Sequence, residues 1–168
     1  MSTATLINWP RQLCASLLIA ICAAAQGAAL RVASGFDPQT MDPHALALLY
    51  QTRIYTQVYD SLVNRDEQFR IEPSLALSWQ ASGATSWRFK LRPGVTFHDG
   101  TPFSADDVVF SIARALGPTS QRAFQLKGVT GAKKIDELTV DVQLEAPDAV
   151  LPEKFVGLAI MSRAWCVK

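Results

Sequence analysis

The sequence has few of the residues from which disulfide frameworks and metal centres are built. Its 168 residues include three cysteines and two histidines. Two of the cysteines lie within the first 29 residues, so a chain processed after residue 29 would keep only Cys166 and could form no internal disulfide. No CxxC motif and no cluster of cysteine and histidine indicates a structural zinc site. We therefore expect no metal and no cofactor.

An excess of charge of either sign is also missing. Lysine and arginine number 16 against 15 aspartates and glutamates, a formal net charge of +1. The first 29 residues contain one of these charges, Arg11, and without it the balance is 16 − 1 = 15 basic against 15 acidic residues. Proteins that bind nucleic acid carry a basic patch, and the sequence shows none. We therefore expect no nucleic-acid partner.

No set of residues forms a catalytic constellation. His98 and Asp99 are adjacent and would point to opposite faces of a strand, and Asp99-Gly100 is typical of a tight turn. His44 and Asp42 would be two metal ligands with no third at a useful spacing. The serines lack the sequence context of a nucleophile elbow. We therefore expect that the protein is not an enzyme.

Residues 1–29 have the pattern of a secretory signal peptide. Arg11 is followed by an uncharged run over residues 13–25 and then by small residues. A short basic start, an apolar run of about 7–15 residues and an A-x-A-like end are typical of signal peptides. A membrane-spanning helix needs about 20 apolar residues. Cleavage is compatible with Ala25 or Ala29, and we favour Ala29; the alternative for this segment is a buried N-terminal helix.

Residues 87–110, WRFKLRPGVTFHDGTPFSADDVVF, contain the clearest local pattern. Apolar and basic residues alternate over residues 87–92, the period of a half-buried strand. Pro93-Gly94 and Asp99-Gly100 predict turns on either side of a short extended piece. The rest of the chain is organised around this stretch.

Ser104 predicts the N-cap of the helix that follows. Its hydroxyl can accept a hydrogen bond from the first turn, and Asp106 and Asp107 place negative charge at the positive end of the helix dipole. In the first turn of a capped helix, these two aspartates are expected to have a structural role rather than to form a metal site or the carboxylate pair of a glycosidase. Gly117-Pro118 predicts the end of the helix. The expected core side of this helix consists of Val108, Val109, Phe110, Ile112, Ala113 and Leu116.

The remaining chain predicts short strands and helices. We expect a first strand at residues 30–33, a helix for which Asp42-Pro43 could be the N-cap with proline at N1, extended pieces at 62–63 and 69–71 around a polar turn, a helix or surface loop at 119–127, a hairpin of strands 132–135 and 138–144, a short helix within 149–160 and a new element near the end. We expect most of the following eight aromatic residues to lie in the core: Tyr50, Tyr55, Tyr59, Trp79, Trp87, Phe89, Phe97 and Phe110.

The stretch LRPGVTFHDGTPFSADDVVFS resembles the signature region of a family of bacterial solute-binding proteins. These are the solute-binding proteins of ABC importers, family 5, the dipeptide/oligopeptide/nickel-binding type. The resemblance extends from about Leu30 to the last residue. Matching patterns upstream are "DPH" at Asp42-Pro43-His44, "VYD-L" at Val58-Tyr59-Asp60-Ser61-Leu62, and "P-LA-SW" at Pro73, Leu75, Ala76, Ser78 and Trp79.

The resemblance implies a mixed α/β chain that is part of a two-lobed, type II periplasmic-binding-protein-like fold. Family members are several times longer, so the chain resembles a truncated portion. Residues 1–29 would be the signal peptide, residues 30–45 the first strand and loop of the larger lobe, and residues 46–168 its α/β subdomain, incomplete at the C-terminus.

The implied function is that of the solute-binding component of an ABC importer. It would bind peptides or a similar small solute in the periplasm and deliver it to the permease subunits in the inner membrane, acting as a monomer. The alternative is a truncated, non-binding remnant of such a protein.

Family members keep an irregular stretch after the "DPH" turn and start the helix a few residues later, so the resemblance implies a helix at residues 50–61. In peptide-binding relatives, an extended stretch shortly after the "DPH" turn pairs with the ligand backbone. Laid on this sequence, it falls on Ala47, Leu48 and Leu49, with Tyr50 beside it. Main-chain pairing tolerates sequence variation because N–H and C=O groups carry the affinity. The acidic residue that many relatives use for the peptide amino terminus would lie beyond Lys168. The resemblance thus implies a ligand-binding set of Ala47, Leu48, Leu49 and Tyr50.

Overall fold

A computed structural model describes residues 31, 33 and 35–167. The chain divides into two units, Met1–Gly35 and Phe36–Lys168, and the fold is that of the second unit. The predicted signal peptide lies outside the described residues, as does most of the strand expected at 30–33.

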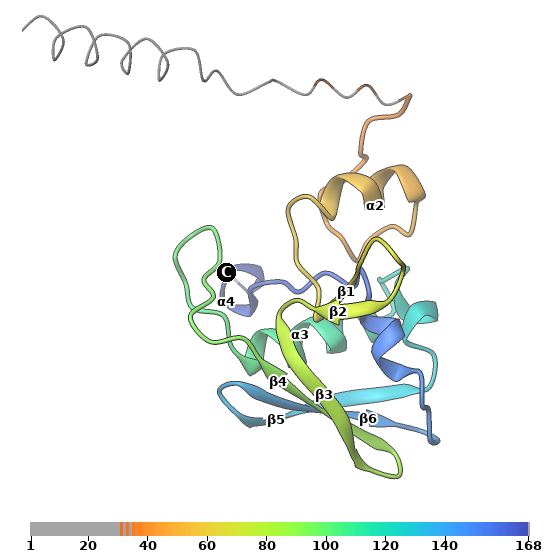
Figure 1. Cartoon of the computed structure of the whole chain (residues 1–168). Coiled ribbons are helices and arrows are strands. Elements are labelled where there is room, and N and C mark those ends of the chain that lie inside the picture. Colours follow the sequence, from red (N-terminus) through yellow and green to blue (C-terminus); the bar gives the residue numbers. More distant parts are fainter. Residues whose placement is uncertain (1–30, 32, 34, 168) are drawn as a thin grey trace, which may run out of the picture. The chain divides into compact units, whose positions relative to one another are not determined.

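A four-stranded antiparallel sheet forms the base of this unit (Figure 1). Its strands follow the order β3-β4-β6-β5, so β4 and β6 are central. Phe89 on β4 is opposite both Trp79 on β3 and Val140 on β6, and its side chain is fully buried. The predicted strand and the predicted hairpin are confirmed. The four strands are β3 (Ala76–Gly83), β4 (Ser86–Leu91), β5 (Val129–Asp136) and β6 (Thr139–Leu144).

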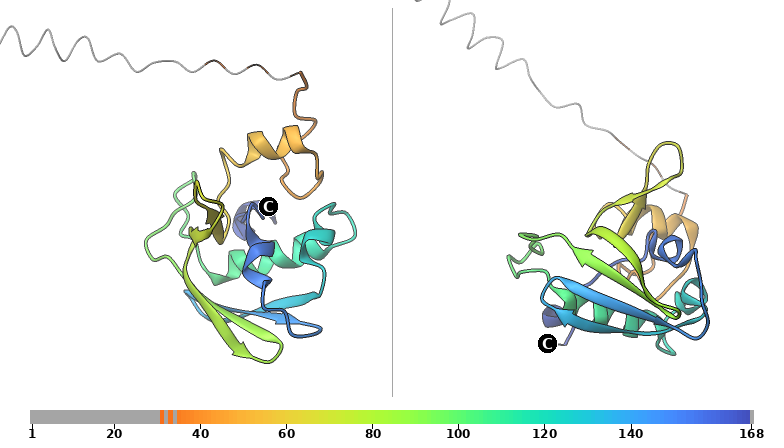
Figure 2. Two further views of the ribbon diagram at one scale, coloured as in Figure 1. Left: turned by 45° about the vertical axis from the view of Figure 1, so that its right-hand side comes forward. Right: turned by 60° about the horizontal axis from the view of Figure 1, so that its bottom comes forward.

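Helix α3 (Ala105–Leu116) covers one face of this sheet (Figure 2). Val108 and Ile112 are fully buried on its inner side. Ser104 is the N-cap as predicted, since its hydroxyl accepts from the Asp106 N–H, and Asp107 completes the capping box by accepting from the Ser104 N–H at 2.9 Å. The local chemistry of this stretch therefore marks the helix start, and the Ala105 N–H adds a distant contact by donating to the Glu137 carbonyl at 2.9 Å.

Short elements surround this two-layer core. The extended pieces expected at 62–63 and 69–71 form a two-stranded antiparallel ribbon, whose turn places Phe69 at a φ of 62°. The helix expected within 149–160 is a single short 3₁₀ turn. The elements are α2 (Leu49–Tyr55), β1 (Val63–Arg65), β2 (Ile71–Pro73), η1 (Ala123–Leu126), η2 (Leu151–Phe155) and α4 (Arg163–Cys166).

The helix expected at 50–61 begins one residue early, at Leu49, and ends six residues early, at Tyr55. The chain beyond it turns and then runs toward the core, where Leu62 is fully buried. The Ile160 N–H donates to the Asp60 carbonyl at 2.9 Å, a bond to a segment 100 residues away. This tertiary contact, rather than helix propensity, decides where α2 stops.

The assignment of Phe110 and Ala113 to the core is wrong. Phe110 is half-buried and Ala113 is exposed. An α-helix turns about 100° per residue, so Phe110 lies on the opposite side from Val108 and Ile112. Phe110, Ala113 and Arg114 share a second face of α3, which borders a surface pocket.

Candidate functional site

The turn at Asp42-Pro43-His44 is held by an ion pair with α3. Arg114 donates to both carboxylate oxygens of Asp42, from Nη1 at 2.8 Å and also from Nη2. The Asp42 Oδ1 atom in addition accepts the His44 N–H at 3.0 Å. The Arg114 guanidinium lowers the pKa of Asp42 through this bidentate contact, so the pair stays ionised across the neutral range.

Arg122 holds the start of α2. Its side chain is buried, donates from Nε to the Pro43 carbonyl at 3.2 Å and from Nη2 to the Thr52 hydroxyl at 2.9 Å. The guanidinium also lies over the Tyr55 ring, 5.1 Å from its centroid, in a cation–π contact. The Arg122 side chain thereby connects the turn before α2 to Thr52 and Tyr55 of the helix.

The four residues implied as ligand contacts form one continuous stretch at the start of α2. Ala47 and Leu48 precede the helix, and Leu48 has extended geometry with φ −92° and ψ 135°. Leu49 is already the first helical residue, so the extended stretch is one residue shorter than predicted. Leu49 is 70% exposed, whereas Tyr50 packs against Phe36 with ring centroids 5.4 Å apart.

The main chain of this stretch is only partly free. The Ala47 N–H donates to Gln121 Oε1 at 3.1 Å, and the Leu48 carbonyl accepts from the Thr52 N–H at 2.9 Å. Within the described part of the chain, no hydrogen bond engages the Ala47 carbonyl or the N–H groups of Leu48 and Leu49. One acceptor and two donors are therefore open, but the Ala47 carbonyl and the Leu48 N–H belong to one trans peptide unit and point in opposite directions.

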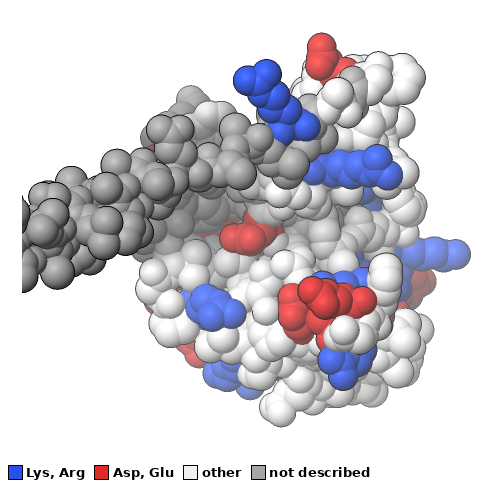
Figure 3. Space-filling view, turned by 45° about the horizontal axis from the view of Figure 1, so that its top comes forward, with Lys and Arg blue, Asp and Glu red and all other residues white. Residues whose placement is uncertain are grey.

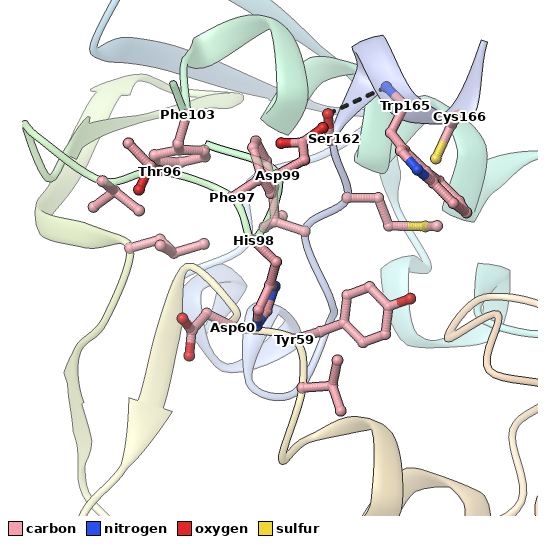
Figure 4. A pocket seen from close by; sticks show the side chains of 15 residues that line it. Tyr59, Asp60, Thr96, Phe97, His98, Asp99, Phe103, Ser162, Trp165 and Cys166 are labelled. Atoms are coloured by element: carbon pink, nitrogen blue, oxygen red, sulfur yellow. Dashed lines mark hydrogen bonds between the residues drawn. The ribbon is translucent and has the colours of Figure 1, made fainter. Parts of the chain in front are cut away.

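Two neighbouring pockets share a wall on another part of the surface. The first, of about 250 Å³, has a mainly apolar floor and carries Asp60 and His98 at its rim, with the His98 ring pointing toward Asp60 (Figure 4). The second, of about 730 Å³, contains the Asp42–Arg114 pair and Phe110. The residues common to both pockets are Tyr59, Met161, Trp165 and Cys166.

The shared wall is apolar and carries groups that stay neutral. Burial raises the pKa of the Tyr59 hydroxyl, and the Asp42 carboxylate adds to this shift. Burial also raises the pKa of the Cys166 thiol, so the thiol remains protonated at neutral pH. Trp165 is 64% exposed. Among the residues described, no group of three or more His, Cys, Asp or Glu side chains could hold a metal ion.

Charge on the surface follows the balanced composition. On the face shown in Figure 3, basic and acidic side chains are interspersed, and neither sign forms a continuous patch. No helix in the described ranges is long and apolar enough to cross a membrane.

Sequence reasoning missed the second face of α3. Phe110 and Arg114 are four residues apart and point into the larger pocket together with Met41. The available signal was an arginine in the mainly apolar second half of the helix, at a spacing that places it beside Phe110 and away from Ile112. That combination indicates a helix with two occupied faces.

The signature region and the fold both match known proteins. Residues 70–164 match the family model of the bacterial extracellular solute-binding proteins, family 5 Middle. The chain belongs to this family. This confirms the resemblance drawn from the signature stretch.

Among curated relatives, the periplasmic murein peptide-binding protein MppA of Escherichia coli K12 is 28% identical over 130 residues, which span 66% of this chain and 24% of MppA. The periplasmic oligopeptide-binding protein OppA of the same strain is 27% identical over 133 residues, or 68% of this chain and 24% of OppA. The HTH-type transcriptional regulator SgrR of Yersinia enterocolitica is 33% identical over 103 residues, or 61% of this chain and 18% of SgrR. The chain thus spans a quarter or less of the length of these relatives.

Solved structures confirm the mixed α/β, periplasmic-binding-protein-like fold. The unliganded open form of MppA matches with a TM-score of 0.71 and 26% identity, over 76% of this chain and 29% of that protein. The binding protein AgaA from A. tumefaciens R10, solved with agropinic acid, matches with a TM-score of 0.68 and 28% identity, over 78% and 28%.

Proposed function

We propose that this protein acts in the solute-binding component of an ABC importer, binding peptides or a similar small solute in the periplasm for delivery to a membrane permease. The observation that carries this proposal is the family membership of residues 70–164. Two relatives named as periplasmic peptide-binding proteins support it. Such a component binds and releases its solute without chemical change, as expected for a chain that we propose is not an enzyme.

We assign the solute contact to Ala47, Leu48, Leu49 and Tyr50. The open carbonyl of Ala47 and the open N–H of Leu49 lie on one side of the extended Leu48 and can pair with the main chain of an extended peptide, whereas the open Leu48 N–H points to the opposite side. The exposed Leu49 side chain gives apolar contact area beside them. Gln121 holds the stretch in place by accepting the Ala47 N–H, and Arg122 does so by donating to the Pro43 carbonyl.

These residues supply one wall of a site. A ligand-binding pocket encloses most of the surface of its ligand, and two main-chain hydrogen bonds at about 1 kcal/mol each do not give micromolar affinity. We therefore expect the 168-residue chain alone to bind peptides only weakly. Calorimetric titration with a mixed peptide library, with MppA as the positive control, tests this. Saturable micromolar binding to the short chain would refute the one-wall mechanism.

Export is tested separately. If residues 1–29 are a signal peptide, N-terminal sequencing of material recovered from the periplasm of an expressing bacterium should begin near Leu30. An intact Met1 on protein confined to the cytoplasm would contradict the proposed location.

A further inference from the structure

The imidazole of His44 is buried with only one of its nitrogens bonded. The residue is 1% exposed, and Nε2 lies 2.9 Å from the Ala159 carbonyl. A carbonyl only accepts, so Nε2 carries a hydrogen, and in the neutral ring Nδ1 is then the unprotonated nitrogen. Nδ1 is buried and has no hydrogen-bond partner. The geometry therefore specifies a neutral imidazole in the Nε2–H form.

A second proton on this ring would have no acceptor. Three charged groups act on the imidazole: Asp42 from its own turn, Arg114 from α3, and Arg122 from the residue before η1. Both oxygens of Asp42 are already engaged by Arg114. Protonation of His44 would thus bring a third positive charge beside two guanidinium groups and one occupied carboxylate.

The same residue ties the proposed solute-binding stretch to the rest of the fold. The His44 carbonyl accepts from the Gln121 N–H at 3.0 Å and from the Ser120 hydroxyl at 3.1 Å. Gln121 in turn holds the Ala47 N–H through its side chain. With the Ala159 contact, His44 connects the start of α2 to two segments more than 70 residues away.

We propose that His44 is a positioning residue for the stretch Ala47–Tyr50, that it holds this stretch only as a neutral imidazole, and that its protonation releases the stretch from Ala159 and Gln121. The role in solute binding rests on the proposed function. The coupling between the protonation of His44 and the order of this stretch is independent of that function.

The direction of the pH effect follows from the environment of the ring. Burial lowers the pKa of His44, and Arg114 acts in the same direction, while the Ala159 contact and Asp42 oppose them. The segment bound in place takes up fewer protons than the released segment, whose histidine has the ordinary pKa of about 6.5. The free energy that holds the stretch Ala47–Tyr50 in place therefore has its full value above about pH 6.5 and decreases as the pH drops below that value.

Hydrogen exchange measured by mass spectrometry on the 168-residue chain at pH 7.5 and pH 5.0 tests the proposal, with rates corrected for the intrinsic effect of pH. We expect protection over residues 42–56 to fall about tenfold or more at pH 5.0, while β4 and α3 keep theirs. His44→Gln keeps an N–H donor for Ala159 but cannot titrate, so its protection over residues 42–56 should not depend on pH. The ¹⁵N spectrum of wild-type His44 should show the Nε2–H tautomer at pH 7.5.

Three results would overturn the proposal: unchanged protection in the wild type, the same loss of protection in His44→Gln, or an Nδ1–H tautomer at pH 7.5. Because no peptide is added, a failure here differs from a failure of the solute-binding function. In that case the stretch Ala47–Tyr50 would bind solute without being released by protonation of His44.

Discussion

Asp107 offers a sharp test of how α3 is fixed to the rest of the fold. The residue is 6% exposed and uses both carboxylate oxygens. Oδ2 accepts the Ser104 N–H at 2.9 Å, and Oδ1 accepts the Arg163 N–H at 2.8 Å. The side chain therefore caps α3 and at the same time holds the start of α4. Replacing it with asparagine keeps the shape but leaves only one acceptor oxygen for two N–H donors.

The expected cost of Asp107→Asn follows from these two contacts. Loss of a helix cap costs about 0.5–2 kcal/mol, and a buried donor left without its acceptor costs about 1–3 kcal/mol. Since the two effects share one side chain, we expect a loss of about 2–3 kcal/mol in the free energy of unfolding, measured by urea denaturation at pH 7.

Asp106→Asn is the matched control. Asp106 is the neighbouring acid, its side chain is 47% exposed, and it pairs with Lys134 at the surface. Such pairs contribute about 0.2–1 kcal/mol. If Asp107→Asn lowered the free energy of unfolding no more than Asp106→Asn does, the double role of Asp107 would be refuted.

The remaining predictions concern the core, a turn and an ion pair. Phe89→Ala should lower the free energy of unfolding, measured by urea denaturation, by about 3–5 kcal/mol because the ring is fully buried. Phe110→Ala should lower it by about 1 kcal/mol or less, and equal losses would show that Phe110 belongs to the core. Asp99→Asn should lower the melting temperature little, since an asparagine oxygen can also accept the Thr101 N–H; a large loss would give Asp99 a role beyond the turn. The lowered pKa of Asp42 predicts stability that is present above its unfolded pKa of about 3.9 and lost as the pH falls through the folded value, and Arg114→Met should flatten this acid limb of the stability curve.

Much of the fold could be predicted from the sequence where local chemistry decides it. The cap at Ser104, the turn at Asp99-Gly100 and the alternation before Pro93-Gly94 are each written within a few residues, and the structure contains all three. The same stretch carried the family resemblance, because its turn and cap residues form a distinctive signature.

The sequence was less informative where distant contacts decide the structure. Helix α2 ends at Tyr55 because the following chain is bonded to Ile160, and nothing near Tyr55 in the sequence encodes that bond. Phe110 was assigned to the core because its hydrophobicity was given more weight than its angular position on α3.

The candidate site shows the same division. Its four residues came from the family pattern and stay a prediction; the structure shows that they span the N-cap and the start of α2. Which main-chain groups remain open was not predictable, because the Ala47 N–H is taken by Gln121, 74 residues further along the chain.

The central claim, that the main chain of Ala47–Leu49 binds the solute, can be measured by ¹H–¹⁵N spectra of the chain during titration with short peptides. We expect the amide signals of Leu48 and Leu49 to shift progressively at about millimolar peptide. Leu49→Pro removes one open donor at the first helical position, where proline is favoured, and Leu48 before it already has the extended geometry that proline requires. The account predicts that Leu49→Pro, which loses one hydrogen bond of about 1 kcal/mol, weakens the peptide binding measured from the Leu48 shift about fivefold, while Leu49→Ala, which keeps the donor, leaves it unchanged. Shifts absent from these residues, or unchanged in Leu49→Pro, would contradict it.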